Sequence, residues 1–152
     1  MWLRFIVYGL GGWCAEVIWT ALGDRLSGRQ SDWRLRGTTY LWMFPLYGML
    51  AIFYEPLHDR LRSRHVLMRA MLYMLGLFAG EFGAGWLLQK LIGACPWDYT
   101  RFSRRHVRGF INLDYAPVWA LAGLALEPVH DWLVRLTPAI RQAAQTRREP
   151  HG

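Results

Sequence analysis

Several acids in this sequence lie within or at the edge of long apolar stretches, where an ionisable side chain is costly and points to function. Two of them, Glu16 and Glu81, lie well inside such stretches. Two more belong to a repeated Glu-Pro-x-His-Asp motif at 55–59 and 127–131. Asp114 is the single charge of another apolar stretch. We expect five acids to form an intramembrane polar site: Glu16, Glu81, Glu55, Glu127 and Asp114.

The repeated motif raises the question of a metal. Two Glu-x-x-His pairs with one glutamate from each of two other helices form the ligand set of a bundle di-iron site. At a rise of 1.5 Å per residue, the motif acids should lie roughly 10 Å from Glu16 and Glu81 along the helix axis. That separation predicts no metal, and leaves only weak candidate ligands: Glu55, His58, Glu127 and His130. The simpler interpretation is a helix-end motif, whose carboxylates reach water or a nearby arginine and whose histidines are interfacial.

Glu16 and Glu81 permit two interpretations. As like charges facing each other they would not both ionise readily, which would suit proton or cation handling. Alternatively they are structural, either hydrogen-bonded between helices or paired with an arginine. Small residues one turn away, Gly12 and Gly85, would let the helices approach closely.

The helices that position these acids can be predicted from long stretches of sequence with few or no charges. Residues 37–54 contain no charge, and residues 5–23, 70–89 and 109–126 contain one acid each. A bilayer-spanning helix needs about 20 apolar residues. We therefore predict an all-α membrane protein with four transmembrane helices, near 3–24, 39–58, 66–92 and 110–133. A buried soluble bundle is the alternative, but four helices that are apolar all round would leave no surface to face water.

Composition excludes several other classes. Apolar residues at 53% and aromatic residues at 15% exclude a disordered chain, and two cysteines exclude a disulfide framework. The net charge of +7 comes from bases that all lie outside the four apolar stretches, so we interpret them as facing headgroups rather than nucleic acid. No nucleotide-binding signature, nucleophile set or cofactor motif is present. The bases divide nine to nine between the two sides, and the arginine-dense loop 59–69 favours both termini inside.

The sequence also contains an internal repeat. A shift of 72 residues aligns 36–62 with 108–134 and gives nine identities in 27 positions, and a shift of 65 places Glu16 on Glu81. We expect a tandem duplication of a two-helix unit, with repeats at about 1–62 and 66–134 and a pseudo-two-fold axis along the membrane normal. Residues 1–134 would form the transmembrane domain, and 135–152 a basic, flexible C-terminal tail.

The loop after the third apolar stretch reads Pro96-Trp97-Asp98-Tyr99. Proline should end the preceding helix. We expect Trp97 and Tyr99 to anchor the loop at the membrane interface. Asp98 can cap the next turn or pair with Arg101.

Three runs carry a resemblance to a known family: Gly37 to Gly48, Cys95 to Tyr99, and Gly109 to Tyr115 with Trp119. Over about residues 5–132 the chain resembles the putative ABC-transporter type IV (CmpB-like) membrane family, and also a group of vertebrate multi-pass transmembrane proteins. The resemblance implies a permease in the membrane, which in a prokaryote is the inner membrane. It also implies a separate ATPase subunit and self-association as a homo-oligomer, with the 59–69 loop as a docking surface for the ATPase.

Three functions remain open at this point. The first is a permease-like transporter subunit, not an enzyme, whose glutamates line a polar path. The second is a non-transporting scaffold or regulatory protein with structural acids. The third is a membrane-embedded metalloenzyme that uses the Glu-x-x-His pairs.

Overall fold

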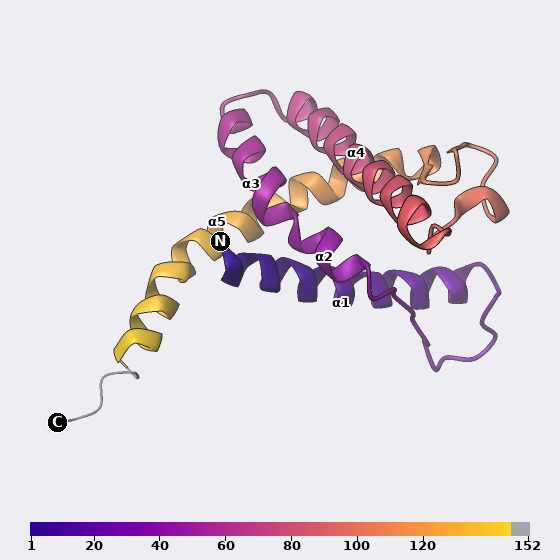
Figure 1. The fold of residues 1–152 in the computed structure, drawn as a ribbon, viewed down its shortest axis with the longest axis horizontal. Coiled ribbons are helices and arrows are strands. Elements are labelled where there is room, and N and C mark those ends of the chain that lie inside the picture. The colour runs from indigo at the N-terminus through magenta and orange to yellow at the C-terminus, as the bar shows by residue number, and fades with distance from the viewer. Residues whose placement is uncertain (147–152) are drawn as a thin grey trace.

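The computed structural model describes residues 1–146, and most of this chain is helical (Figure 1). The α-helices are α1 (Trp2–Leu26), α2 (Met43–Gly48), α3 (Leu50–Leu61), α4 (Val66–Ile92) and α5 (Ala116–Thr146). Two short 3-10 helices, η1 (Tyr99–Arg101) and η2 (Leu113–Tyr115), and a small hairpin of β1 (His106–Val107) and β2 (Ile111–Asn112) lie between α4 and α5.

Helices α2 and α3 form one broken helix, so the chain has four long helical segments. Met49 separates the two helices in a turn conformation, with φ −65° and ψ −13°. Its neighbour Gly48 lies against the ring of Phe5 on α1, where a Cβ atom would approach that ring to 2.7 Å. Pro45 lies in the first turn of α2, where a missing backbone N–H breaks no helical bond. The broken helix thereby follows α1 closely.

Helices α1 and α4 are long and apolar enough to cross a membrane, and they are the two such helices among residues 1–146. Only 17% of the most apolar part of α1 is buried, and 28% of that of α4. Large apolar side chains such as Ile18, Leu67 and Leu87 face outward instead. The core helices of a soluble bundle would be mostly buried, so these outward apolar faces favour contact with lipid.

The second and fourth predicted helices begin later than expected. Residues 39–40 have no regular structure and residues 41–42 form a turn before α2, while residues 106–115 form the hairpin and η2 before α5. The all-α prediction is therefore wrong for this short segment. Both segments carry few charges, which is why the sequence pattern resembled a continuous helix. Their backbone groups are satisfied by turns instead, as in the bond from Leu113 N–H to the Arg105 carbonyl (2.8 Å).

Close contacts at glycine join α1 to α2 and α4 to α5. Gly12 on α1 faces the ring of Tyr47 on α2, and Gly123 on α5 faces the Cβ atom of Tyr73 on α4. Added Cβ atoms at these glycines would lie 2.1 Å and 2.3 Å from the facing side chains. The loops that follow α1 and α4 lie at the same end of the molecule (Figure 1).

Helix α5 extends well beyond the predicted transmembrane domain. It continues to Thr146, so residues 135–146 of the predicted tail are helical. Residues 147–152, which complete that tail, lie outside the described residues.

Candidate functional site

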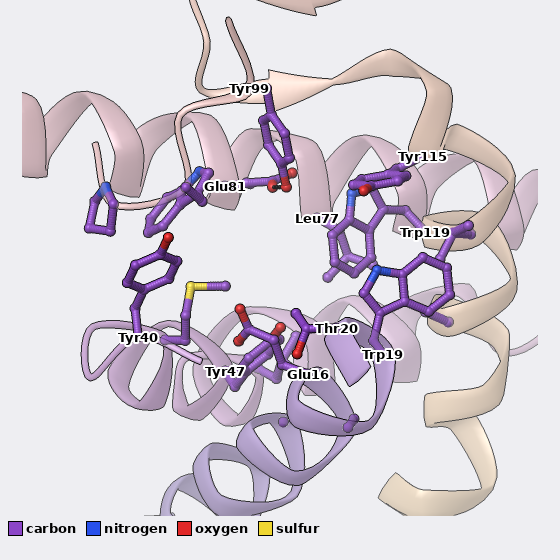
Figure 2. A pocket seen from close by; sticks show the side chains of 18 of the residues that line it. Glu16, Trp19, Thr20, Tyr40, Tyr47, Leu77, Glu81, Tyr99, Tyr115 and Trp119 are labelled. Atoms are coloured by element: carbon purple, nitrogen blue, oxygen red, sulfur yellow. Dashed lines mark hydrogen bonds between the residues drawn. The ribbon is translucent and has the colours of Figure 1, made fainter. Parts of the chain in front are cut away.

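A cavity of about 1120 Å³ lies between α1, α2, α4, the 93–102 loop and the first half of α5. Glu16 on α1 and Glu81 on α4 point into this space from opposite walls (Figure 2). Aromatic side chains form much of the remaining wall, among them Trp19, Tyr40, Tyr47, Tyr99, Tyr115 and Trp119. The cavity therefore combines two acids with several aromatic rings.

Glu16 is held by the irregular segment that precedes α2. The hydroxyl of Thr39 donates to Glu16 Oε2 at 2.7 Å. The same segment is also hydrogen-bonded to α1 through Thr38, the residue before Thr39. The Thr20 hydroxyl donates to the Thr38 carbonyl (2.9 Å) and accepts from the Thr38 N–H (2.8 Å). The predicted helix start at residue 39 is thus replaced by an irregular segment that carries a hydrogen-bond donor to the acid.

Glu81 is more deeply buried, with an exposed fraction of 6%. Its Oε1 atom accepts a hydrogen bond from the Tyr99 hydroxyl at 2.6 Å. Its Oε2 atom is buried and has no hydrogen-bond donor among the residues that the structure describes. The indole N–H of Trp119, also on the cavity wall, interacts with the Glu81 carboxyl group, although it forms no hydrogen bond of ordinary geometry among the described residues. A buried carboxylate oxygen of this kind has unused capacity to bind a ligand.

The Pro96–Tyr99 loop is responsible for the contact with Glu81. Trp97 is buried, and its indole N–H donates to the Phe110 carbonyl at 3.0 Å. Tyr99 N–H donates to the carbonyl of Gly109 (3.0 Å), which has a φ of +76° and so favours glycine. The predicted anchoring of Trp97 and Tyr99 at the membrane interface stays a prediction, but their side chains do not project from the loop. Both point inward and close one side of the cavity.

Asp98 caps η1, which is one of its two predicted roles. Its Oδ1 atom accepts from the Thr100 N–H at 3.0 Å. This backbone hydrogen bond holds the pKa of Asp98 below its ordinary value. Burial acts in the opposite sense on the next residue and raises the pKa of the Tyr99 hydroxyl well above its usual range. Tyr99 therefore stays protonated and remains a donor to Glu81 at physiological pH.

Substituting Tyr99→Phe should lower the free energy of unfolding by about 1–3 kcal/mol, because it leaves the buried Glu81 carboxylate without its donor. Unfolding of the detergent-solubilised protein by added sodium dodecyl sulfate measures the change. The matched control is Tyr40→Phe, at an exposed tyrosine of the same cavity, for which we expect a change within about 0.5 kcal/mol. Equal effects of the two substitutions would contradict a supporting role for the Tyr99 hydroxyl.

The other two glutamates belong to a separate group of polar residues, where α1, α3, α4 and α5 meet. We call it the paired-histidine cluster, and its members are Arg4, Glu55, His58, Asp59, Arg62, Arg69, Tyr73, Glu127, His130 and Asp131. Arg4 Nε lies 2.8 Å from Glu55 Oε1, and Arg69 Nε lies 3.0 Å from Glu127 Oε1. Each motif glutamate thus reaches an arginine, as the helix-end interpretation expects. His58 and His130 are both packed inside the protein, each with an exposed fraction of only 3%, and their depth in a membrane stays a prediction.

The contacts within this cluster are reciprocal between the two motifs. His58 lies 3.7 Å from Glu127 and 3.8 Å from Asp131. His130 lies 3.5 Å from Glu55 and 3.4 Å from Asp59. The two imidazole rings face each other edge to face, with their centroids 5.0 Å apart. Each histidine therefore contacts the two acids of the other motif.

The structure brings together only part of the predicted site. Glu16 and Glu81 share the large cavity, whereas Glu55 and Glu127 lie in the paired-histidine cluster. Asp114 is exposed in η2, where it accepts from the Ser103 hydroxyl (3.1 Å) and lies 3.5 Å from Arg105. The six-residue di-iron ligand set is accordingly divided between two places.

Sequence reasoning missed the partners of these acids. The shift of 65 residues that aligns Glu16 with Glu81 also aligns Arg4 with Arg69 and Tyr8 with Tyr73. Those repeated arginines are the residues that pair with Glu55 and Glu127, so the signal was present in the repeat. Tyr99 and Thr39 carry no such signal.

Two helices are long and apolar enough to cross a membrane and carry outward-facing apolar side chains, and a cavity lies between the helices. The model of the family described as putative ABC-transporter type IV matches residues 3–146, and the chain belongs to that family. No solved structure gives a significant match. The family description points to a transporter-related protein rather than an enzyme, and it agrees with a location in the membrane.

Proposed function

We propose that the chain is a permease-like transporter subunit whose central cavity binds a small organic cation between Glu16 and Glu81. The observation that carries this proposal is the buried Glu81 Oε2 atom, which has no hydrogen bond of ordinary geometry and no cationic partner among residues 1–146. A bound cation would supply the missing partner. The polar path expected for a permease then passes along these two glutamates.

The contrast between the two pairs of glutamates supports a cationic ligand. Glu55 and Glu127 each have an arginine of the chain as a partner. Within the described residues Glu16 and Glu81 form no ion pair, and Tyr99 and Thr39 provide neutral donors only. The single arginine that lines the cavity, Arg101, lies on η1 and is exposed. Negative charge in the cavity is therefore left for a ligand to neutralise.

The aromatic wall supports an organic cation rather than a metal ion. Trp19 and Tyr115 meet edge to face with ring centroids 6.1 Å apart, and Tyr99 and Tyr115 do so at 5.8 Å. Aromatic faces attract alkylammonium and similar cations, with energies of about 0.5–2 kcal/mol per ring. A volume of about 1120 Å³ is large enough for a drug-sized molecule.

The binding test uses tetraphenylphosphonium, with tetraphenylborate as an anion of similar shape. Both are titrated against lipid nanodiscs that contain the full chain, with empty nanodiscs subtracted. We expect Glu81→Gln to weaken tetraphenylphosphonium binding at least about tenfold, which corresponds to roughly 1.4 kcal/mol. Glu16→Gln should act in the same direction. Asp114→Asn, at an acid outside the cavity, is the matched control and should leave binding unchanged.

Two results would overturn a cation site: equal binding of the borate anion, or unchanged binding in both glutamine variants. Uptake into proteoliposomes, and copurification of an ATPase with the intact chain, separate a permease from a scaffold. If the cation binds but neither uptake nor a copurified ATPase is found, the permease assignment is wrong. The chain is then better described as a non-transporting scaffold or regulatory protein.

We propose further that the chain is a tandem duplication with a pseudo-two-fold axis through the paired-histidine cluster. The reciprocal contacts of His58 and His130 support it, because a two-fold axis makes each contact occur twice. The turn between the two units is short, since α3 ends at Leu61 and α4 begins at Val66. Arg60 and Arg64 are exposed beside it, which suits the expected docking of a separate ATPase subunit at this turn.

A further inference from the structure

The two histidines of the paired-histidine cluster lie in an arrangement that the proposed transport function does not use. His58 is on α3 and His130 on α5, and both are buried. One nitrogen from each histidine and one carboxylate oxygen of Asp59 lie within 4.8 Å of one another. The Nδ1 atom of His130 is buried with no hydrogen-bond partner among the described residues. These groups are therefore close enough to converge on a single ion.

The tautomer of His58 follows from its neighbours. The Tyr73 hydroxyl donates its only hydrogen to Glu127 Oε1 at 2.9 Å. His58 Nδ1 lies 2.9 Å from the same hydroxyl oxygen, so this nitrogen must be the donor. The lone pair of neutral His58 is then on Nε2, which lies 3.8 Å from Asp131 Oδ1.

His130 has the same orientation relative to the opposite motif. Its Nδ1 atom lies 3.5 Å from Glu55 Oε1, and its Nε2 atom is hydrogen-bonded to Asp59 Oδ1 at 3.4 Å, a contact that a shared metal ion would replace. Metal-binding histidines commonly direct one ring nitrogen to an acceptor of this kind and use the other as the ligand. Both imidazoles thus direct Nδ1 toward a glutamate and Nε2 toward an aspartate.

We propose that His58, His130 and Asp59 bind a divalent transition-metal ion such as Zn²⁺, with Asp131 available as a fourth ligand. Imidazole nitrogens and carboxylate oxygens are ordinary zinc ligands, and four of them complete a tetrahedral site. This set differs from the di-iron set considered above. The proposed ligand set includes no residue of the large cavity. Glu55 and Glu127 are not ligands in it, and they act by contacting the two histidines.

Access to this site is from solvent and is restricted by one arginine. A second, smaller cavity of about 400 Å³ is lined by Asp59, Arg62, His130 and Asp131, among others. Arg62 contacts Asp131 and lies 3.2 Å from His58 Nε2, so its guanidinium faces the lone pair that the metal needs. The Arg62 side chain is 55% exposed and is free to withdraw into water. Arg62 should therefore compete with the metal.

The test is a titration of Zn²⁺ and of Co²⁺ into the untagged, chelator-treated full chain in detergent. Competition with a chromophoric chelator gives the Zn²⁺ affinity, and the visible absorption of Co²⁺ reports the coordination geometry. We expect one ion per chain. His130→Gln and Asp59→Asn should each weaken binding by about 100-fold, and Tyr73→Phe by about 10-fold through the orientation of His58.

Two further variants separate metal binding from a structural role. His65→Asn, at a histidine that caps α4 outside the cluster, should bind Zn²⁺ as the wild type does. Arg62→Gln should bind it more tightly, by about tenfold, because it removes the competing guanidinium. The helical circular dichroism of each variant verifies folding. Fewer than one ion per chain in the wild type, or equal affinity in wild type, His130→Gln and Asp59→Asn, would overturn the proposal.

Discussion

Replacing Arg4 by methionine should lower the free energy of unfolding by about 3–5 kcal/mol. Its partner Glu55 is almost fully buried, and Arg4 Nε donates to both carboxylate oxygens, at 2.8 Å and 3.0 Å. Removing one member of a buried ion pair leaves the other charge without compensation, which is much more costly than losing an exposed pair. Unfolding by sodium dodecyl sulfate in mixed micelles measures the change.

Two variants make this prediction specific. Arg60→Met removes an exposed arginine of α3 and should change stability by less than about 1 kcal/mol. The double variant Arg4→Met/Glu55→Gln should recover part of the loss, because the glutamine is neutral and can be buried at lower cost. If Arg4→Met is no more harmful than Arg60→Met, or if the double variant recovers nothing, the pair does not neutralise a buried charge.

Trp97→Ala should be comparably destabilising, by about 3–5 kcal/mol. Trp97 packs against Met43 and Leu88, and its indole N–H satisfies the Phe110 carbonyl. The alanine variant loses this packing, leaves a cavity and breaks the hydrogen bond. It should also weaken tetraphenylphosphonium binding, because the loop that carries Tyr99 would no longer be fixed against α4.

The matched control is Trp33→Ala, at an exposed tryptophan that contacts Arg25 through its ring face at 4.5 Å. Such an exposed cation–π contact contributes about 0.5–1 kcal/mol. Trp97→Phe should fall between the two, because it keeps much of the ring and loses the hydrogen bond. Equal stability of Trp97→Ala and Trp33→Ala would show that the loop does not depend on Trp97.

The sequence was informative about the helices because charge is so unevenly distributed. The uncharged runs around Glu16 and Glu81 predicted α1 and α4 with ends close to those observed. The same reasoning failed where a loop is also poor in charge. Thr39 lies in an irregular segment and Phe110 in a hairpin, although the hydropathy pattern around each resembles the start of a helix.

The site was predictable to a smaller extent, because its partners come from distant parts of the chain. Acids within apolar stretches identified Glu81, but its donor is Tyr99, on a loop that composition alone places at the membrane surface. For Asp114 the prediction failed in the opposite sense, because an acid expected inside the membrane is exposed. A single charge in an apolar run does not reveal that the run begins with an exposed turn. Side-chain direction in loops depends on backbone turns such as that at Gly109, which periodicity does not describe.

The proposed tandem duplication, which the reciprocal histidine contacts support, has an evolutionary consequence. An interface of this kind ordinarily forms between two copies of one small protein, and both copies must then change together. Fusion into a single polypeptide removes that requirement and allows each half to diverge. The two halves differ most clearly in the donors to their acids. The segment from Cys95 to Tyr115 places the Tyr99 hydroxyl beside Glu81, whereas the donor to Glu16 is Thr39. Under the proposed duplication, an ancestral homodimer would have had two acids in identical surroundings, whereas in this chain Glu16 and Glu81 have different donors.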